Sequence, residues 1–282
     1  MALGINSNIA SINAQNQLGK SQSLSNQALE RLSSGLRINS AKDDAAGMAI
    51  STRFDAQVRG LTVAQRNAND GISLAQTTEG ALNEVTNNLQ RIRELAVQAA
   101  NGTNGDEDKA ALQQEVTDRM AEIDRLTTDT KFNGIQVLNG GVPAGGGAAA
   151  ALVFQVGADS GQTISIDMTS HVMDTATLTG GALDITGDNA AVGAEIVKID
   201  EALTKVNDFR SELGAVQNRF ESTIANLGTS IENMSAANSR ILDADFAAES
   251  AKMAKANVLQ QAGISVLAQA NARPNQVLSL LQ

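Results

Sequence analysis

The side chains that could carry out acid–base chemistry are few and scattered. Asp43 and Asp44 are adjacent carboxylates that could act as a general acid and base, but Asp43 follows Ser40 at the spacing of a helix capping box. Acids in the first turn of a helix interact favourably with its dipole, so we interpret the pair as a helix start. His171 is the only histidine, and the sequence offers no second member of a catalytic triad or ligand set. We therefore expect His171 to be an ordinary surface residue.

Other reactive patterns are missing or incomplete. The chain has no Cys, which excludes disulfides, thiol catalysis and thiolate-bound metals. It has no phosphate-binding loop, no dinucleotide fingerprint and no His-Glu-x-x-His zinc motif. Asn67–Gly71 resembles part of a calcium loop, but it lacks the distal Glu and lies within helical periodicity. We therefore predict a protein that is not an enzyme and that binds no cofactor or metal ion.

The composition fits long helices better than a compact enzyme. Aromatic residues make up 2% of the 282 residues, with no Trp or Tyr, whereas 42% are hydrophobic. Because aromatic side chains supply much of a typical globular core, small and aliphatic side chains must form this one. The net charge of −10 disfavours nucleic acid as a partner. The sequence has neither a membrane-spanning apolar run nor the pattern of a secretory signal. We therefore expect no membrane insertion and, if the protein is exported, a route that does not read a cleaved signal peptide.

The clearest spacing in the chain runs from Ile199 to Ile241. Apolar residues recur there in alternating steps of four and three, which is typical of a helix that packs lengthwise on another helix. At about 1.5 Å per residue this helix is about 65 Å long, so it needs other helices from this chain or from copies of it. Arg210, Gln217 and Asn238 occupy seam positions, where polar residues commonly set the register.

Two further helices and a small β region are predicted before this long helix. The first helix runs from about Asp43 to Ala100, with Gly71 and Gly80 as points of close packing or bending. A second, shorter helix contains residues 112–126. The apolar period then changes to two, and we interpret residues 152–156 and 163–168 as a β-hairpin. The predicted fold is mainly α: a long antiparallel helical or coiled-coil rod from both chain ends, with a small β-hairpin region in the middle.

Both chain ends are helical in pattern and nearly uncharged. Residues 1–19 contain no charged side chain, and between Ala256 and Gln282 the only charge is Arg273. We expect Pro274 to break or bend the final helix. The ends are either frayed termini or segments that order only inside an assembly that excludes water. The residues predicted to pack in the core of that assembly are Ile5, Ile9, Ile12, Leu29, Leu32, Val258, Leu259, Val266, Leu278 and Leu281.

Several motifs resemble those of bacterial flagellin. The matching segments are Ser33–Ser51, Leu89–Gln98, Lys131–Gly134, Leu213–Phe220 and Val258–Gly263. The resemblance covers roughly residues 1–140 and 190–282, and the segment between them looks like an outer variable region reduced to almost nothing. It implies a subunit that self-assembles into the extracellular flagellar filament, the propeller of bacterial motility. The resemblance further implies that the subunit is exported unfolded and is added at the filament tip by coupled folding and binding of its termini.

The flagellin resemblance also implies a domain organisation. Residues 1–40 and 245–282 correspond to the inner core of the filament, and residues 41–140 and 188–244 to a helical shaft. Residues 141–187 replace the outer domains with a short hairpin and loop segment.

Partners are implied by the same resemblance. They are further copies of the chain, a flagellar export chaperone that holds about residues 245–282, a filament cap protein, hook–filament junction proteins and the host Toll-like receptor that senses flagellin. Carried over by motif, receptor recognition falls on Arg91, Leu95, Gln98, Glu115 and Ile199. The alternative for these five positions is packing within the shaft, and both roles are compatible.

Two other functions compete with that of a filament subunit. A hook–filament junction protein resembles flagellin at its ends. A secreted helical binding module, such as an adhesin or effector, would have no need for two uncharged ends and would stay monomeric at high concentration.

Overall fold

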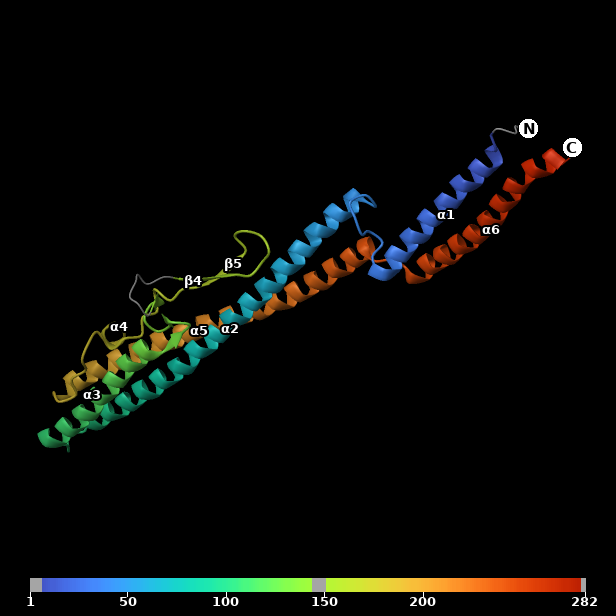
Figure 1. The fold of residues 1–282 in the computed structure, drawn as a ribbon. Helices are drawn as coiled ribbons and strands as arrows, with labels where there is room; N and C mark the ends of the chain where they lie inside the picture. The colour runs from blue at the N-terminus through green and yellow to red at the C-terminus, as the bar shows by residue number, and fades with distance from the viewer. Residues whose placement is uncertain (1–6, 144–150, 280–282) are drawn as a thin grey trace. The chain divides into compact units, whose positions relative to one another are not determined.

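A computed structural model describes residues 7–143 and 151–279, with side chains up to residue 272 in the last helix. The predicted core residues Ile5 and Leu281, and the side chain of Leu278, lie outside this described part. The fold is mainly helical, as predicted (Figure 1). Its helices are α1 (Ile9–Ser34), α2 (Ala45–Ala99), α3 (Asp106–Asp129), α4 (Thr175–Thr179), α5 (Asn189–Leu242) and α6 (Phe246–Ser279).

The chain forms two compact units, to which α2 and α5 both contribute. The central unit comprises Val58–Ile231, and the terminal unit comprises Met1–Gln57 with Glu232–Gln282. The predicted assignment of segments to the inner core and the shaft of a filament stays a prediction.

The core of the central unit is aliphatic and closed to water. It lies between α2, α3 and α5, and the apolar seam of α5 is buried as its spacing predicts. Its fully buried members include Leu82, Leu89, Ile92, Val116, Ile123, Val206, Phe209, Leu213 and Phe220.

The two glycines predicted to perturb α2 differ in their surroundings. A Cβ at Gly71 would lie 2.6 Å from Cζ of Phe220, so Gly71 permits this ring to pack against the helix. Gly80 has open space beside it, and α2 continues through both positions. Of these two glycines, only Gly71 is a point of close packing.

Short antiparallel strands cover one part of the central unit. Strands β1 (Lys131–Phe132), β2 (Ile135–Gln136) and β3 (Val142–Pro143) form one sheet, and β4 (Leu152–Gln155) and β5 (Thr163–Ile166) form another. The second sheet is the predicted hairpin, with Phe154 opposite Ile164. Its alternating pattern buries Ile164 and Ile166, while the ring of Phe154 meets that of Phe220 edge-on at 5.5 Å.

The start of α2 differs from the predicted capping box. The Asp43 carboxylate accepts hydrogen bonds from the backbone N–H and hydroxyl of Ser40, both at 3.1 Å, but this closes a turn before the helix. The helix begins at Ala45, and Asp44 Oδ1 accepts from the Gly47 N–H at 2.9 Å. Asp44 is therefore the cap, and the pair does not lie in the first helical turn. At the start of α5, Asp188 accepts a hydrogen bond from the Ala191 N–H at 2.8 Å.

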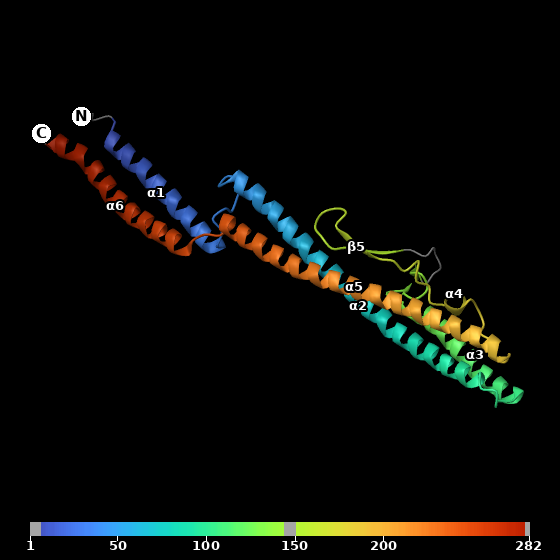
Figure 2. The ribbon, with the colours of Figure 1, turned by 180° about the vertical axis from the view of Figure 1, so that it is seen from behind.

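In the terminal unit, α1 and α6 lie side by side (Figures 1 and 2). Gly35, with φ of 73°, ends α1, and the linkers after α1 and α5 pair antiparallel at Leu36 and Asp243. The Ala244 N–H donates to the Gly35 carbonyl at 2.9 Å, and the Arg37 guanidinium donates to the Ile241 carbonyl. The two linkers therefore hold the two helices together at one end.

Helix α6 continues past Pro274 to Ser279, so this proline does not break the helix, and the alternative of a bend stays a prediction. A proline inside a helix leaves the carbonyl four residues earlier without its N–H partner. Here that carbonyl belongs to Ala270, and the side-chain amide of Asn8 donates to it at 2.8 Å. A replacement donor thus satisfies the group that the proline leaves open.

Candidate assembly surface

The most deeply buried positions between α1 and α6 are mostly small or polar, although Leu18 also approaches Gly263. The small residues buried there are Ser11, Ser21, Ser25, Ala28, Ala256 and Ala270. The Ser25 hydroxyl donates to Asn257 Oδ1 at 3.2 Å, and the Ser11 hydroxyl donates to Asn271 Oδ1 at 2.8 Å. These pairs show that the helices run antiparallel. The seam contributes little hydrophobic stabilisation, because few apolar atoms leave water in it.

The aliphatic side chains of the same two helices point outward. Six predicted assembly residues are between 40% and 64% exposed: Ile9, Ile12, Leu29, Val258, Leu259 and Val266. Leu32 is half-buried. Leu24 and Ile264 are also exposed, and neither was predicted from the sequence. Exposed aliphatic side chains in this number are typical of a site of association. Within one chain these residues pack little, so their predicted packing requires neighbouring molecules.

Charges gather where α1 ends and α6 begins. Glu249 is 5% exposed, and its Oε1 accepts from Arg31 at 3.2 Å and from Lys252 at 2.7 Å. These two cations, Lys252 first, hold the pKa of Glu249 below its ordinary value. Breaking such a buried pair leaves an uncompensated charge, so this cluster ties α1 to α6 beside the linkers.

Of the five residues assigned to receptor recognition, three lie at the surface and two lie in the core. Arg91 donates to Glu115 at 2.9 Å and to Glu94 at 3.0 Å, and Gln98 is exposed on the same helix. The hydrogen bond from Arg91 lowers the pKa of Glu115. Leu95 and Ile199 are 1% and 0% exposed, so they support the helices from inside. Only Arg91, Gln98 and Glu115 present their side chains at the surface.

Polar residues in the α5 seam meet a carboxylate of α2. Glu79 accepts from Gln217 at 3.3 Å and lies 3.9 Å from an Arg210 nitrogen. A slip of one helix along the other would separate these groups. Arg210 and Gln217 therefore share one partner across the two helices, and the role of the seam positions Arg210, Gln217 and Asn238 in setting the register stays a prediction.

His171 is half-buried rather than an ordinary surface residue. Its ring stacks on Phe209 with centroids 4.4 Å apart, and Nε2 lies 3.4 Å from Glu212. Asp167 shares the turn, and bonds from Thr169 and Ser170 lower its pKa to about 2. His171 thus packs the loop after β5 against α5.

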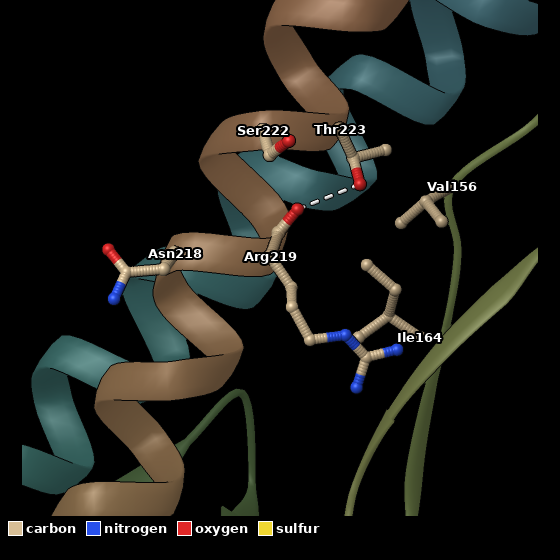
Figure 3. A pocket seen from close by; sticks show the side chains of 6 residues that line it. All are labelled: Val156, Ile164, Asn218, Arg219, Ser222 and Thr223. Carbon is tan, nitrogen blue, oxygen red and sulfur yellow. Dashed lines mark hydrogen bonds between the residues drawn. The ribbon is translucent and has the colours of Figure 1, made fainter.

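A shallow hollow of about 420 Å³ lies between the hairpin and α5 (Figure 3). Val156 and Ile164 form its apolar side, and the Arg219 side chain extends along Ile164. Asn218, Ser222 and Thr223 complete the lining. None of these six residues is a carboxylate or an imidazole, so the hollow offers no general acid–base pair. In the described part of the chain, no helix is long and apolar enough to cross a membrane.

A closed helical core together with a pair of helices that carry outward aliphatic side chains is typical of a structural subunit. Comparisons with known proteins identify the family. Residues 5–142 match the bacterial flagellin N-terminal helical region, and residues 196–281 match the bacterial flagellin C-terminal helical region. The chain belongs to the bacterial flagellin family, a family of structural proteins that form the extracellular flagellar filament.

Full-length relatives agree with this assignment. The chain is 49% identical to a flagellin of Xenorhabdus nematophila, over 100% of both chains. It is 46% identical to a flagellin of Halalkalibacterium halodurans, over 99% of both. The crystal structure of Bacillus cereus flagellin matches with a TM-score of 0.50 and 36% identity, covering 61% of this chain and 94% of that one.

Proposed function

We propose that this filament subunit polymerises by coupled folding and binding of its two ends. The observation that carries the proposal is the reversed polarity of the α1–α6 pair, with serines and alanines in its seam and aliphatic residues outside. The contact between two such helices buries little apolar area, so it contributes little free energy to their folding. Neighbouring copies that cover the aliphatic side chains supply the missing burial and offset the entropy of ordering the ends.

The central unit is already complete in a single chain. Its aliphatic core is buried without any partner. We therefore infer that it stays folded in the monomer and during addition to a growing filament, as a structural body rather than an enzyme. This division of roles distinguishes a polymer subunit from a secreted binding module, whose terminal helices would need no outward aliphatic face.

Removal of both terminal helices tests this proposal. A chain restricted to residues 45–242 retains the linked helices of the central unit and lacks α1 and α6. We expect it to stay folded by circular dichroism and to form no filaments after seeding, as judged by electron microscopy. The full chain is the control. Ordinary filaments from the trimmed chain would refute the proposal.

We further propose export without a cleaved signal peptide, followed by polymerisation under a cap protein. An export chaperone would cover α6, whose outward Val258, Leu259 and Val266 need shielding in a single chain. Hook–filament junction proteins would meet the same terminal surface. The chaperone proposal predicts that replacing these three residues by Ser weakens chaperone capture of the unpolymerised chain.

Recognition by the flagellin-sensing Toll-like receptor is the remaining proposal. It is supported by Arg91, Gln98 and Glu115 on one exposed part of α2 and α3, with Leu95 and Ile199 positioning those helices from the core. We expect Arg91→Ala with Glu115→Ala to reduce receptor signalling by the monomer. Arg125→Ala, which removes an exposed α3 arginine paired within its own helix, is the matched control. Undiminished signalling by the double variant would reject the assignment.

A further inference from the structure

Asn8 makes two different hydrogen bonds with the two ends of its side-chain amide. Its Oδ1 accepts from the Ser11 N–H at 3.1 Å and caps the start of α1. Its Nδ2 donates at 2.8 Å to the Ala270 carbonyl of α6. That carbonyl is the one that Pro274 leaves without a helical partner. Asn8 therefore satisfies an open donor in one helix and an open acceptor in the other.

Few side chains could take both roles. Ser and Asp also cap helices well, but an ionised Asp has no donor, and a Ser hydroxyl is shorter than the amide. Ala270 is 7% exposed, so water has little access at this point of the contact. An unpartnered carbonyl there would be unfavourable. The Asn8 amide can therefore donate to the one carbonyl of α6 that Pro274 leaves open, that of Ala270.

Apart from the Ser11–Asn271 and Ser25–Asn257 hydrogen bonds, the middle of the α1–α6 seam offers little that fixes the alignment. Ser21, Ser25 and Ala28 of α1 are small, so a partner helix could slide past them with little steric resistance. Pro274 is the only proline in α6, so the open carbonyl marks a single register. The Arg31–Glu249 pair marks the same register at the opposite end of the contact.

We propose that Asn8 and Pro274 form a latch that sets the register in which α1 meets α6 when the subunit joins a polymer. Asn8 is a positioning residue, since it acts through the alignment of the outward aliphatic side chains. Correct alignment fixes where the outward side chains of the two helices, such as Ile12 and Val266, stand relative to each other when neighbouring copies meet them. The inference rests on the proposed polymerisation, because assembly is where alignment takes effect.

A double-mutant cycle separates this role from helix capping. Asn8→Ser keeps the cap and removes the amide donor, and we expect it to raise the critical concentration for seeded polymerisation roughly fivefold. Pro274→Ala restores an N–H that can reach the Ala270 carbonyl within α6. In the Pro274→Ala background the same Asn8→Ser change should have little effect. A merely structural role in capping α1 would give equal effects in both backgrounds.

Two further variants of α1 serve as controls for this double-mutant cycle. Asn13→Ser, at an exposed position on α1, should leave polymerisation unchanged. Asn8→Asp, which keeps the cap but places a carboxylate oxygen against a carbonyl, should be worse than Asn8→Ser. Equal penalties for Asn8→Ser in the unaltered chain and in the Pro274→Ala variant would overturn the latch. Failure of the unaltered chain to polymerise would instead refute the proposed function.

Discussion

The two units of the molecule use aliphatic side chains in opposite ways. In the central unit, Leu89 and Phe220 are fully buried, and charged residues such as Arg93 lie outside. In the α1–α6 pair, Ser21 and Ser25 are buried, and Val258 and Ile12 lie outside. Burial of apolar area is the main favourable contribution to folding, so we expect one unit to be complete alone and the other to become complete on association. Stability and assembly are thereby assigned to different parts of one chain.

The largest expected effect is a cavity in the central core. Phe220→Ala removes a ring that packs against Gly71 and meets Phe154 edge-on. We expect the free energy of unfolding of the central unit to fall by about 3–5 kcal/mol, measured by chemical denaturation of the monomer. A change below about 1 kcal/mol would show that this core is not the closed body described here.

Removal of outward side chains of α6 should weaken polymerisation and leave the stability of the monomer unchanged. Val258→Ala with Val266→Ala should leave monomer unfolding unchanged within about 0.5 kcal/mol, because both residues are more than half exposed. The critical concentration for polymerisation should rise by at least tenfold, since buried methyl groups are lost at each site, and each tenfold is about 1.4 kcal/mol. Val153→Ala, at an exposed valine of the hairpin, is the control. Loss of monomer stability without loss of assembly would show that these side chains stabilise the single chain and do not serve assembly.

Acid should weaken the terminal unit through Glu249. The pKa of Glu249 is lowered by Lys252 and Arg31, so its ionised form stabilises the folded pair. This contribution is fully present above the ordinary value of 4.5 and is lost as pH falls through the lower folded pKa. We expect the critical concentration to rise below about pH 4.5 and this rise to be smaller in Glu249→Gln. Glu30→Gln, at an exposed acid on α1, should keep the full pH dependence.

The smallest expected effect comes from surface ion pairs of the central unit. Arg93 donates to Asp200 at 2.7 Å, but both side chains are nearly half exposed. Exposed pairs of this kind contribute at most about 1 kcal/mol. Arg93→Ala should therefore change thermal unfolding and polymerisation only slightly. A large loss of assembly would identify this surface as a second contact between copies.

Periodicity predicted the helices and the hairpin because burial on one face imposes it on the sequence. The seam of α5 and the alternation around Ile164 are of this kind. The arrangement within the terminal pair followed less directly. Ile9 and Ile12 were assigned to the core of an assembly, but no pattern predicted that Ser11 would be buried between α1 and α6. Which face of α1 meets α6 depends on the partner helix, and periodicity within α1 does not specify it.

Local signals also failed where a distant group decided the outcome. Pro274 reads as a helix break, yet Asn8, far away in sequence, supplies the missing donor. Leu95 and Ile199 were assigned by resemblance to a recognition surface. The packing of α2 and α5 in the folded chain buries both side chains. His171 was expected at the surface, and its stacking on Phe209 required the loop after β5 to reach α5.

Hydrogen exchange on the monomer and the polymer tests the central claim most directly. The amides of residues 82–99 in the central unit should be strongly protected in both states. The amides of residues 9–34 and 246–272 should exchange readily in the monomer and become protected in the polymer. Equal protection of these terminal helices in the two states would contradict the account, because it would mean that they are complete before any neighbour arrives.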